Sequence, residues 1–176
     1  SVSNRIKYLS NFNNFIKHKN VNYFKEKITY PIKDKIDTDV DKAFSRVSNS
    51  GDVVLKCDID GGEYNVIDGI LKYSSRIKML IFEFHLVDNN EQNFYNSIKK
   101  IQELYDIIHI HGNNHFQKLE SGLPLILEIT LINKKYAPKN PEFIYAFPIQ
   151  DLDYPNNPYK EDLVFSFREW NFFYLI

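Results

Sequence analysis

The chain of 176 residues has the length and the composition of one globular domain. Hydrophobic residues make up 43% of it and charged residues 26%, with six glycines and seven prolines, which excludes disordered, collagen-like and low-complexity chains. Its 22 basic and 23 acidic side chains leave a net charge of -1, so no overall field draws it to nucleic acid or to an acidic membrane. We therefore expect neither nucleic acid nor a membrane among its partners.

The single cysteine and the short apolar stretches predict the compartment. Cys57 cannot form an internal disulfide, and the first residues lack the unbroken apolar core of a signal peptide. The longest apolar stretches, such as residues 79–82, fall far short of the roughly 20 residues that span a bilayer. These features predict a cytoplasmic protein with Cys57 in its core.

The glycine positions bear on cofactor binding. None of their spacings forms a G-x-G-x-x-G turn or a G-x-x-x-x-G-K-[ST] phosphate loop. If the domain binds a nucleotide-like cofactor, this chain does not carry the usual glycine loop. The six positions are Gly51, Gly61, Gly62, Gly69, Gly112 and Gly122.

The first segment, residues 1–37, is basic and predicts an amphipathic helix followed by a strand. Ser3 is a favourable helix cap. Thr38 is expected to cap a second, short helix that ends at residues 48–52, where serine, asparagine and glycine gather. The apolar residues that recur at near-helical spacing after Ser3 are Ile6, Leu9, Phe12 and Ile16.

The second segment, residues 38–135, alternates strand-like and helix-like patterns. The order strand, helix, strand, helix, strand predicts an α/β fold whose parallel strands are joined by right-handed helical crossovers. We expect strands at 53–59, 77–84 and 106–111 and helices at 63–73 and 91–105.

A final strand is expected at residues 125–133. The dozen residues before it show no helical pattern, and parallel neighbours usually need a helical crossover, so this strand should run antiparallel. The third segment, residues 136–176, is rich in proline and asparagine and then in aromatics. It predicts an extended arm or an extra edge strand.

Acidic residues, histidines and asparagines are frequent at the ends of the predicted strands. In an open parallel sheet, ligands bind beyond the carboxyl ends of the strands. The segments at those ends are residues 58–63, 83–85 and 109–115, which hold two aspartates, two glutamates, four histidines and two asparagines. This composition suits acid/base catalysis or metal binding.

Asp58 and Glu83 are the strongest candidates. Each carboxylate lies in an apolar strand end, where a charge needs a partner, and we favour a functional role for both. Asp60 and Glu63 fit a D-x-x-E capping box, a ligand role, or both. His85 is either functional or a hydrogen-bonded core histidine.

The histidines and asparagines near residue 111 are more ambiguous. His109 and His111 share one face of a strand, a spacing that metal sites use, although a hydrogen-bonded turn is the simpler interpretation. Asn113 and Asn114 most simply form a turn.

These segments resemble one protein family. Residues 55–64 (L-K-C-D-I-D-G-G-E-Y) and 66–71 (V-I-D-G-I-L) are similar to the K-I-D-V-E-G-A-E…V-L-x-G-hydrophobic segment of FkbM-type S-adenosylmethionine-dependent methyltransferases. Residues 81–85 (I-F-E-F-H) resemble the I-x-x-E-x-H strand that follows it there. Residues 109–114 and 127–130 resemble later segments of one subgroup. The family's N-terminal half, which holds its glycine loop, has no counterpart in this chain.

The resemblance implies a class I methyltransferase-like (Rossmann-like) fold, here a partial sheet, and methyl transfer to a hydroxyl of a sugar or similar small molecule. Asp58, Glu83 and His85 are then the catalytic candidates, with Asp58 near the methyl donor and the other two beside the acceptor. Asp58, Asp60 and Gly61 would bind the cofactor S-adenosylmethionine. No metal is expected. The residues assigned to substrate binding are Glu63, His111, Asn113 and Asn114.

Two other functions stay open. One is a non-catalytic binding or assembly module derived from a methyltransferase, and the weaker one is a metal-dependent hydrolase that uses Asp58, Glu83, His85 and His111. A partial sheet leaves an unpaired edge and uncovered apolar faces, so we also expect a homo-oligomer. The late aromatics that could cover such a surface are Phe165, Phe167, Trp170, Phe172 and Phe173.

Overall fold

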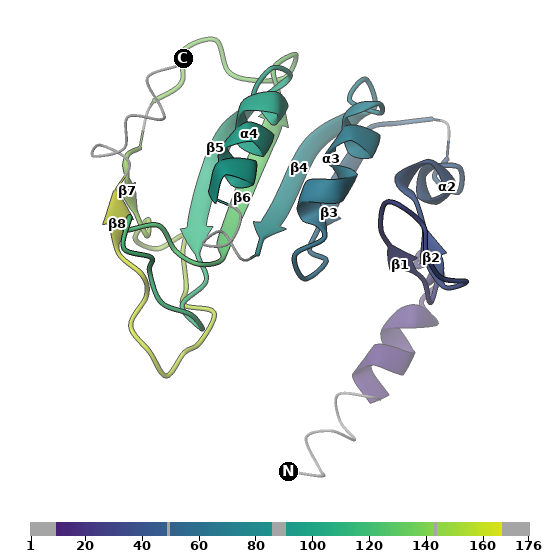
Figure 1. The fold of residues 1–176 in the computed structure, drawn as a ribbon, viewed down its shortest axis with the longest axis horizontal. Coiled ribbons are helices and arrows are strands. Elements are labelled where there is room, and N and C mark those ends of the chain that lie inside the picture. Colours follow the sequence, from purple (N-terminus) through teal and green to yellow (C-terminus); the bar gives the residue numbers. More distant parts are fainter. Residues whose placement is uncertain (1–9, 49, 86–90, 143, 167–176) are drawn as a thin grey trace.

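A mixed four-stranded sheet lies at the centre of the computed structural model, which describes residues 10–48, 50–85, 91–142 and 144–166 (Figure 1). Its strands lie in the order β3, β4, β6, β5. The α/β class expected from the sequence is confirmed. The strands are β3 (Val53–Cys57), β4 (Ile77–Phe84), β5 (Tyr105–Gly112) and β6 (Leu127–Asn133).

Strand β6 runs antiparallel to both of its neighbours, as predicted. Strands β3 and β4 are parallel and are connected through helix α3 (Glu63–Leu71). Strand β5 points the same way as β4 but does not pair with it, because β6 lies between them. The long connection after Gly112 lets the chain turn back and insert its last strand there.

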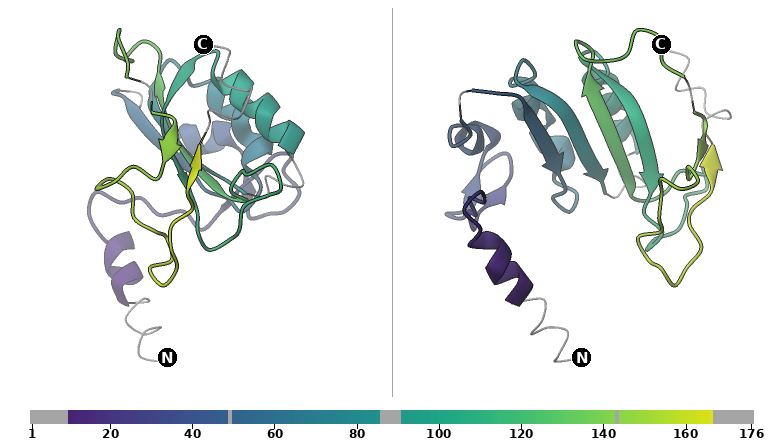
Figure 2. Two further views of the ribbon diagram at one scale, coloured as in Figure 1. Left: turned by 90° about the vertical axis from the view of Figure 1, so that its left-hand side faces the viewer. Right: turned by 180° about the vertical axis from the view of Figure 1, so that it is seen from behind.

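Both long helices cover the same face of this sheet (Figure 2). Helix α3 buries Val66, Ile67 and Ile70, and α4 (Glu91–Ile101) buries Phe94, Ile98 and Ile101 at the spacing of one helical face. The strands meet them with alternate residues, since successive side chains of a strand point to opposite faces. These core residues are Leu80, Phe82, Phe84, Leu127, Ile129 and Leu131.

The other face of the sheet is open and mixed in character. The strand register places Val54 beside Met79, and Met79 beside Ile132. Val54 is 62% exposed, and the other two are half-buried. One covered and one open face is typical of a sheet that contains antiparallel strands.

The chain before the sheet forms small elements along the edge of β3. Residues 10–16 are helical, with Phe12 and Ile16 half-buried, and the ring of Phe12 contacts Tyr23 edge-on. Residues 1–9, which include the expected cap Ser3, lie outside the described residues. Strands β1 (Lys27–Ile28) and β2 (Asp37–Thr38) then pair in parallel, so the expected boundary after residue 37 falls within β2.

The cap of helix α2 (Val40–Phe44) differs from the prediction. Thr38 was expected to cap this helix, but it is buried in β2, where its carbonyl accepts a hydrogen bond from Thr29. Asp39 is the N-cap instead, and its side chain accepts a hydrogen bond of 2.7 Å from the backbone N–H of Lys42.

Tyr105 also differs from the prediction. The expected helix over 91–105 would end at Tyr105, but α4 ends at Ile101 and Tyr105 begins β5. The ring is completely buried, and its hydroxyl donates a hydrogen bond to the Ile77 carbonyl, so packing outweighs the local helical pattern.

The tail adds a separate two-stranded sheet of β7 (Ala146–Phe147) and β8 (Phe165–Ser166). Phe147 and Phe165 are buried and stack on each other. A Cβ at Gly112 would lie 2.7 Å from Pro124 and 3.1 Å from Phe165, so glycine is what allows this close approach. The later aromatics, from Phe167 onward, lie outside the described residues.

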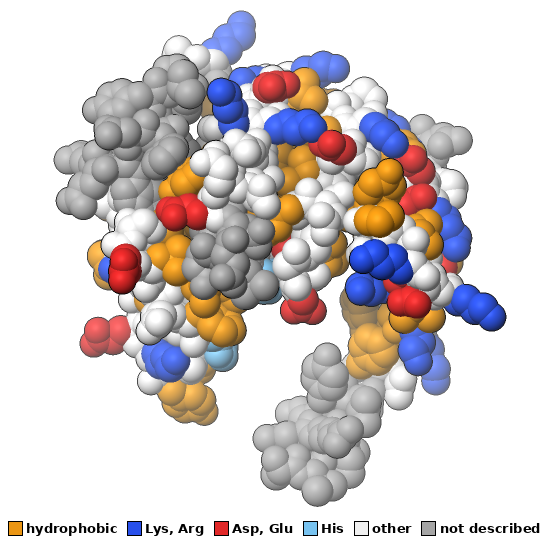
Figure 3. Space-filling view, in the orientation of Figure 1, with side chains coloured by type: hydrophobic (Ala, Val, Ile, Leu, Met, Phe, Trp, Pro, Cys, Tyr) orange, Lys and Arg blue, Asp and Glu red, His pale blue; other side chains and the backbone are white. Residues whose placement is uncertain are grey.

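Basic and acidic side chains are interspersed on the helix-covered face of the molecule (Figure 3). Among the described residues, no helix combines the length and the apolarity needed to cross a membrane. Cys57 is buried and free, as expected, and burial raises the pKa of its thiol to about 12.

Leu131 offers a direct test of the inserted strand. Replacing this completely buried residue by alanine should lower the free energy of unfolding by about 2 to 5 kcal/mol, because the loss of buried methyl groups leaves a cavity. Urea denaturation measures the change. The exposed Val54→Ala is the matched control and should stay within about 0.5 kcal/mol of the parent. Equal effects of the two substitutions would contradict this placement of β6.

Candidate functional site

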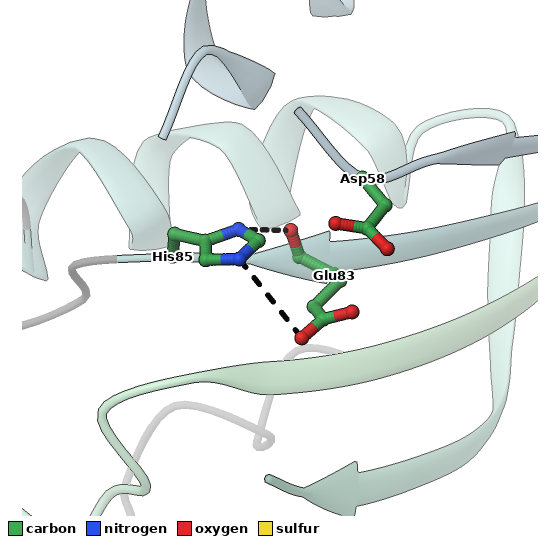
Figure 4. Close-up of side chains that lie close together, drawn as sticks. All are labelled: Asp58, Glu83 and His85. Atoms are coloured by element: carbon green, nitrogen blue, oxygen red, sulfur yellow. Dashed lines mark hydrogen bonds and ion pairs between the residues drawn. The ribbon is translucent and has the colours of Figure 1, made fainter. Parts of the chain in front are cut away.

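Asp58, Glu83 and His85 come together where β3 and β4 end (Figure 4). Cys57 pairs with Phe82 in the parallel ladder, so the residues that follow emerge side by side. One ligand atom from each of the three side chains lies within 4.8 Å of the other two. The structure thus brings together all three residues that were predicted to be catalytic.

The ring of His85 is held from one side. Its Nδ1 lies 3.1 Å from the backbone oxygen of Glu83 and 3.1 Å from Oε1 of Glu63. Both partners are acceptors, so we assign the proton to Nδ1. Nε2 then faces the cluster, 3.9 Å from the Glu83 carboxylate and 3.9 Å from that of Asp60, which is too far for a hydrogen bond.

Glu63 supports this arrangement from the core. Its side chain is completely buried, and Oε1 also accepts backbone hydrogen bonds from Ile59 and Gly61. The expected capping box of Asp60 and Glu63 is wrong, because the N-cap of α3 is Gly62 and Glu63 is the first residue of the helix, so the Glu63 carboxylate contacts the N–H groups of Ile59 and Gly61 and not that of Asp60. Asp60 has a φ of +53°, and its side chain is turned fully into solvent.

The two carboxylates of the cluster differ in their surroundings. Nζ of Lys56 lies 3.0 Å from Asp58; partial burial acts to raise the pKa of Asp58, but this ammonium group outweighs it and leaves the pKa lowered. Asn113, a predicted substrate-binding residue, donates a hydrogen bond of 3.0 Å to Glu83. Burial raises the pKa of Glu83, and the nearby Asp58 charge adds to the rise.

Asp58, Asp60 and Gly61, in the loop of residues 58–62, were expected to bind S-adenosylmethionine. A glycine loop does so by turning free backbone N–H groups toward its ligand. Here the N–H groups of Ile59 and Gly61 point to Glu63, and the Asp60 side chain is turned into solvent. In this structure these two N–H groups are therefore not free to bind a ligand.

His111 belongs to a neighbouring cluster. Its Nε2 lies 3.0 Å from Asp162, and its Nδ1 lies 3.5 Å from Glu128. The Glu128 contact raises the pKa of His111 to about 9, assisted by Asp162, and lowers the pKa of Glu128 in return. Glu128 pairs with Glu83 in the ladder, so the two clusters lie side by side on the open face.

Asn114 and His109 hold the C-terminal segment and do not join the cluster. The buried amide of Asn114 donates to the backbone oxygens of Asn157, Lys160 and Glu161 and accepts from the Asn157 N–H. The ring of His109 lies 2.9 Å from Asp153. This structural role differs from the substrate contact predicted for Asn114.

Lys56, Glu128 and Asp162 were not identified as candidates from the sequence. Glu128 alternates with the apolar residues of its strand, which places it on the open face, but only the pairing of β6 shows that it lies between Glu83 and His111. Asp162 lies 51 residues beyond His111, so no local pattern connects the two.

Comparisons with protein-family models, with curated proteins and with solved structures find no match for this chain.

The pH dependence of stability should report the His111 contacts. A raised pKa stabilises the folded state fully below about pH 6.5, and this contribution is lost as pH rises through about 9. The free energy of unfolding should therefore exceed that of His111→Gln by on the order of 3 kcal/mol near pH 6, and the difference should shrink toward pH 10. Urea denaturation across this range measures it, with the exposed His115→Gln as control. A difference independent of pH would contradict the assignment.

The pKa of Glu83 should respond to Asp58. In Asp58→Asn a neighbouring negative charge is lost, so the raised pKa of Glu83 should fall toward its ordinary value of about 4.3. Carboxyl ¹³C NMR titration measures the shift. Asp60→Asn changes the same kind of group at a solvent-exposed position and should move this pKa less. Equal shifts in the two variants would show that Asp58 and Glu83 are not closely coupled.

Proposed function

We propose that this chain carries the acceptor side of an S-adenosylmethionine-dependent O-methyltransferase-like site, acting on a hydroxyl of a sugar or similar small molecule. The observation that carries the proposal is the orientation of His85. Glu63 and the Glu83 carbonyl hold Nδ1, so Nε2 faces the space between the carboxylates of Asp58 and Glu83. An imidazole oriented in this way is suited to accept a proton.

The proposed roles follow from these contacts. An acceptor hydroxyl beside Glu83 donates its proton to Nε2 of His85, which becomes an imidazolium. The Glu63 carboxylate, 3.1 Å from Nδ1, stabilises that positive charge and keeps the ring in place. Asp58 and Glu83 orient the remaining hydroxyl groups, and Asn113 holds the Glu83 carboxylate. The deprotonated oxygen is then the nucleophile.

The methyl donor needs residues beyond those of the loop at 58–62, whose inward N–H groups contact Glu63. The proposal therefore places the donor cradle on another polypeptide segment or subunit. What supports the family at a coarse level is the α/β fold with an antiparallel last strand, together with the motifs around Asp58 and Glu83.

The same observation favours a second candidate, a binding or assembly module that keeps the acceptor side without methyl transfer. The two candidates share the acceptor cluster and differ in the donor. Self-association, expected from the open face of the sheet, stays a prediction that light scattering can test.

Titrations of the chain with donor and acceptor test both candidates. Calorimetry should show that S-adenosylmethionine binds no tighter than about millimolar, because no glycine loop offers it free N–H groups. Mono- and disaccharides should shift the ¹⁵N signals of His85 in the parent, and Glu83→Gln should lose these shifts while His115→Gln keeps them.

The outcomes separate the candidates. Micromolar donor binding would contradict the predicted weak binding and favour the enzyme over the module. Saccharides that leave His85 unshifted would contradict the acceptor site in both. With a complete donor site present, His85→Gln should lower kcat by about 10²- to 10⁴-fold.

A further inference from the structure

The cluster of Asp58, Glu83 and His85 has a second chemical capacity, which goes beyond the proposed function and needs no methyl donor. We propose that these three side chains bind one divalent cation that accepts mixed nitrogen and oxygen ligands, as Zn²⁺ or Mn²⁺ does, through two carboxylates and Nε2 of the imidazole. The three side chains leave further positions on the ion for water or for a hydroxyl group.

The spacing of the ligand atoms supports this proposal. One atom from each of the three side chains lies within 4.8 Å of the other two, and Nε2 of His85 lies 3.9 Å from Oε1 of Glu83. Bonds of about 2.0 to 2.3 Å to a shared ion separate its ligand atoms by roughly 3 to 4.5 Å. The Nε2 to Oε1 distance is too long for a hydrogen bond but falls within the range for two ligands of one ion.

Glu63 supplies an independent observation. This completely buried carboxylate contacts Nδ1 of His85, and its second oxygen, Oε2, has no hydrogen-bond partner among the residues that the structure describes. A buried charge needs compensation. A cation on Nε2 supplies it through the ring, since a metal-bound imidazole typically donates its other N–H to a carboxylate.

The negative charges on the open face of the sheet also favour a bound cation. Asp58 and Glu83 lie close together, Glu128 is the ladder partner of Glu83, and Lys56 contacts Asp58 at the outer side. In the described part of the chain, the Lys56 ammonium and the His85 ring are the only basic groups that form ion pairs with Asp58 or Glu83. A divalent cation would relieve the repulsion between the two carboxylates.

The imidazole ligand decides the kind of ion. Carboxylates alone suit Mg²⁺ or Ca²⁺, whereas an imidazole favours Zn²⁺ and related transition metals. A cation on Nε2 also prevents that nitrogen from accepting a proton. The cation-bound cluster is therefore a state in which the base assigned to His85 is blocked.

Calorimetry with ZnCl₂ on the full chain, without donor or acceptor, tests the proposal. We expect one ion per chain and at least tenfold weaker binding of Mg²⁺ and Ca²⁺. Glu83→Gln and His85→Gln should each weaken Zn²⁺ binding at least tenfold. Lys56→Gln should strengthen it, because it frees an oxygen of Asp58. The control His115→Gln removes an exposed histidine and should change nothing.

A second measurement keeps the test independent of the stability of the variants. In the parent, Zn²⁺ should shift the Nε2 ¹⁵N signal of His85. A histidine with a purely structural role would show no such shift. Glu63 is a positioning residue, so Glu63→Gln should shift the Nδ1 signal and weaken binding about 10- to 100-fold.

Three results would overturn the proposal: an unshifted His85 signal, equal affinity for Mg²⁺ and Zn²⁺, or binding that His115→Gln weakens as much as His85→Gln does. Because no acceptor is present, none of them bears on the proposed acceptor site.

Discussion

The insertion of β6 between β4 and β5 is the constraint on which the rest of the structure depends. Leu131 pairs with Leu80 on one side and with Ile107 on the other, so one strand joins two otherwise separate parts of the sheet. The covered side of β6 fills the core beneath the helices. On its open side, Glu128 lies between Glu83 and His111. The pairing of β6 therefore determines the position of core residues on one face and of these polar residues on the other.

At the carboxyl ends of β3 and β4, a buried carboxylate is stabilised by hydrogen bonds without which its burial would cost free energy. Glu63 lies in the core without solvent contact, and three donors converge on its Oε1. These contacts fix the start of α3 and the ring of His85 together. The start of the helix, the end of β4 and the direction of Nε2 therefore depend on one carboxylate. A small displacement of α3 would change the orientation of the histidine.

The C-terminal segment depends on polar contacts as well as on packing. Two histidines of β5, His109 and His111, face aspartates of this segment, and the Asn114 amide contacts its backbone. Phe147 and Phe165 supply the apolar part of the attachment. The segment therefore lies beside the carboxyl end of β5, close to the candidate site, even though it follows the last strand of the central sheet.

The sequence by itself determined the elements whose patterns are local. Hydrophobic alternation and helical spacing predicted β3 to β6, α3 and α4, and the missing helical pattern before β6 predicted its direction. The rule that ligands bind at the carboxyl ends of strands selected Asp58, Glu83 and His85, which the parallel pairing of β3 and β4 then brings together. The elements and the proximity of these three side chains are confirmed, because they depend on neighbours in the chain or on consecutive strands.

Only the tertiary structure decided the remaining features. The position of β6 between β4 and β5, and with it the position of Glu128, depends on how strands distant in the sequence pair in the sheet. Tyr105 lies in a strand because its ring packs in the core. Asp60 does not cap α3, because its backbone conformation, with a positive φ, turns the side chain outward. The approach of Asp162 to His111 spans 51 residues. Such contacts depend on packing between segments that are distant in the sequence. A pattern of neighbouring residues cannot predict them.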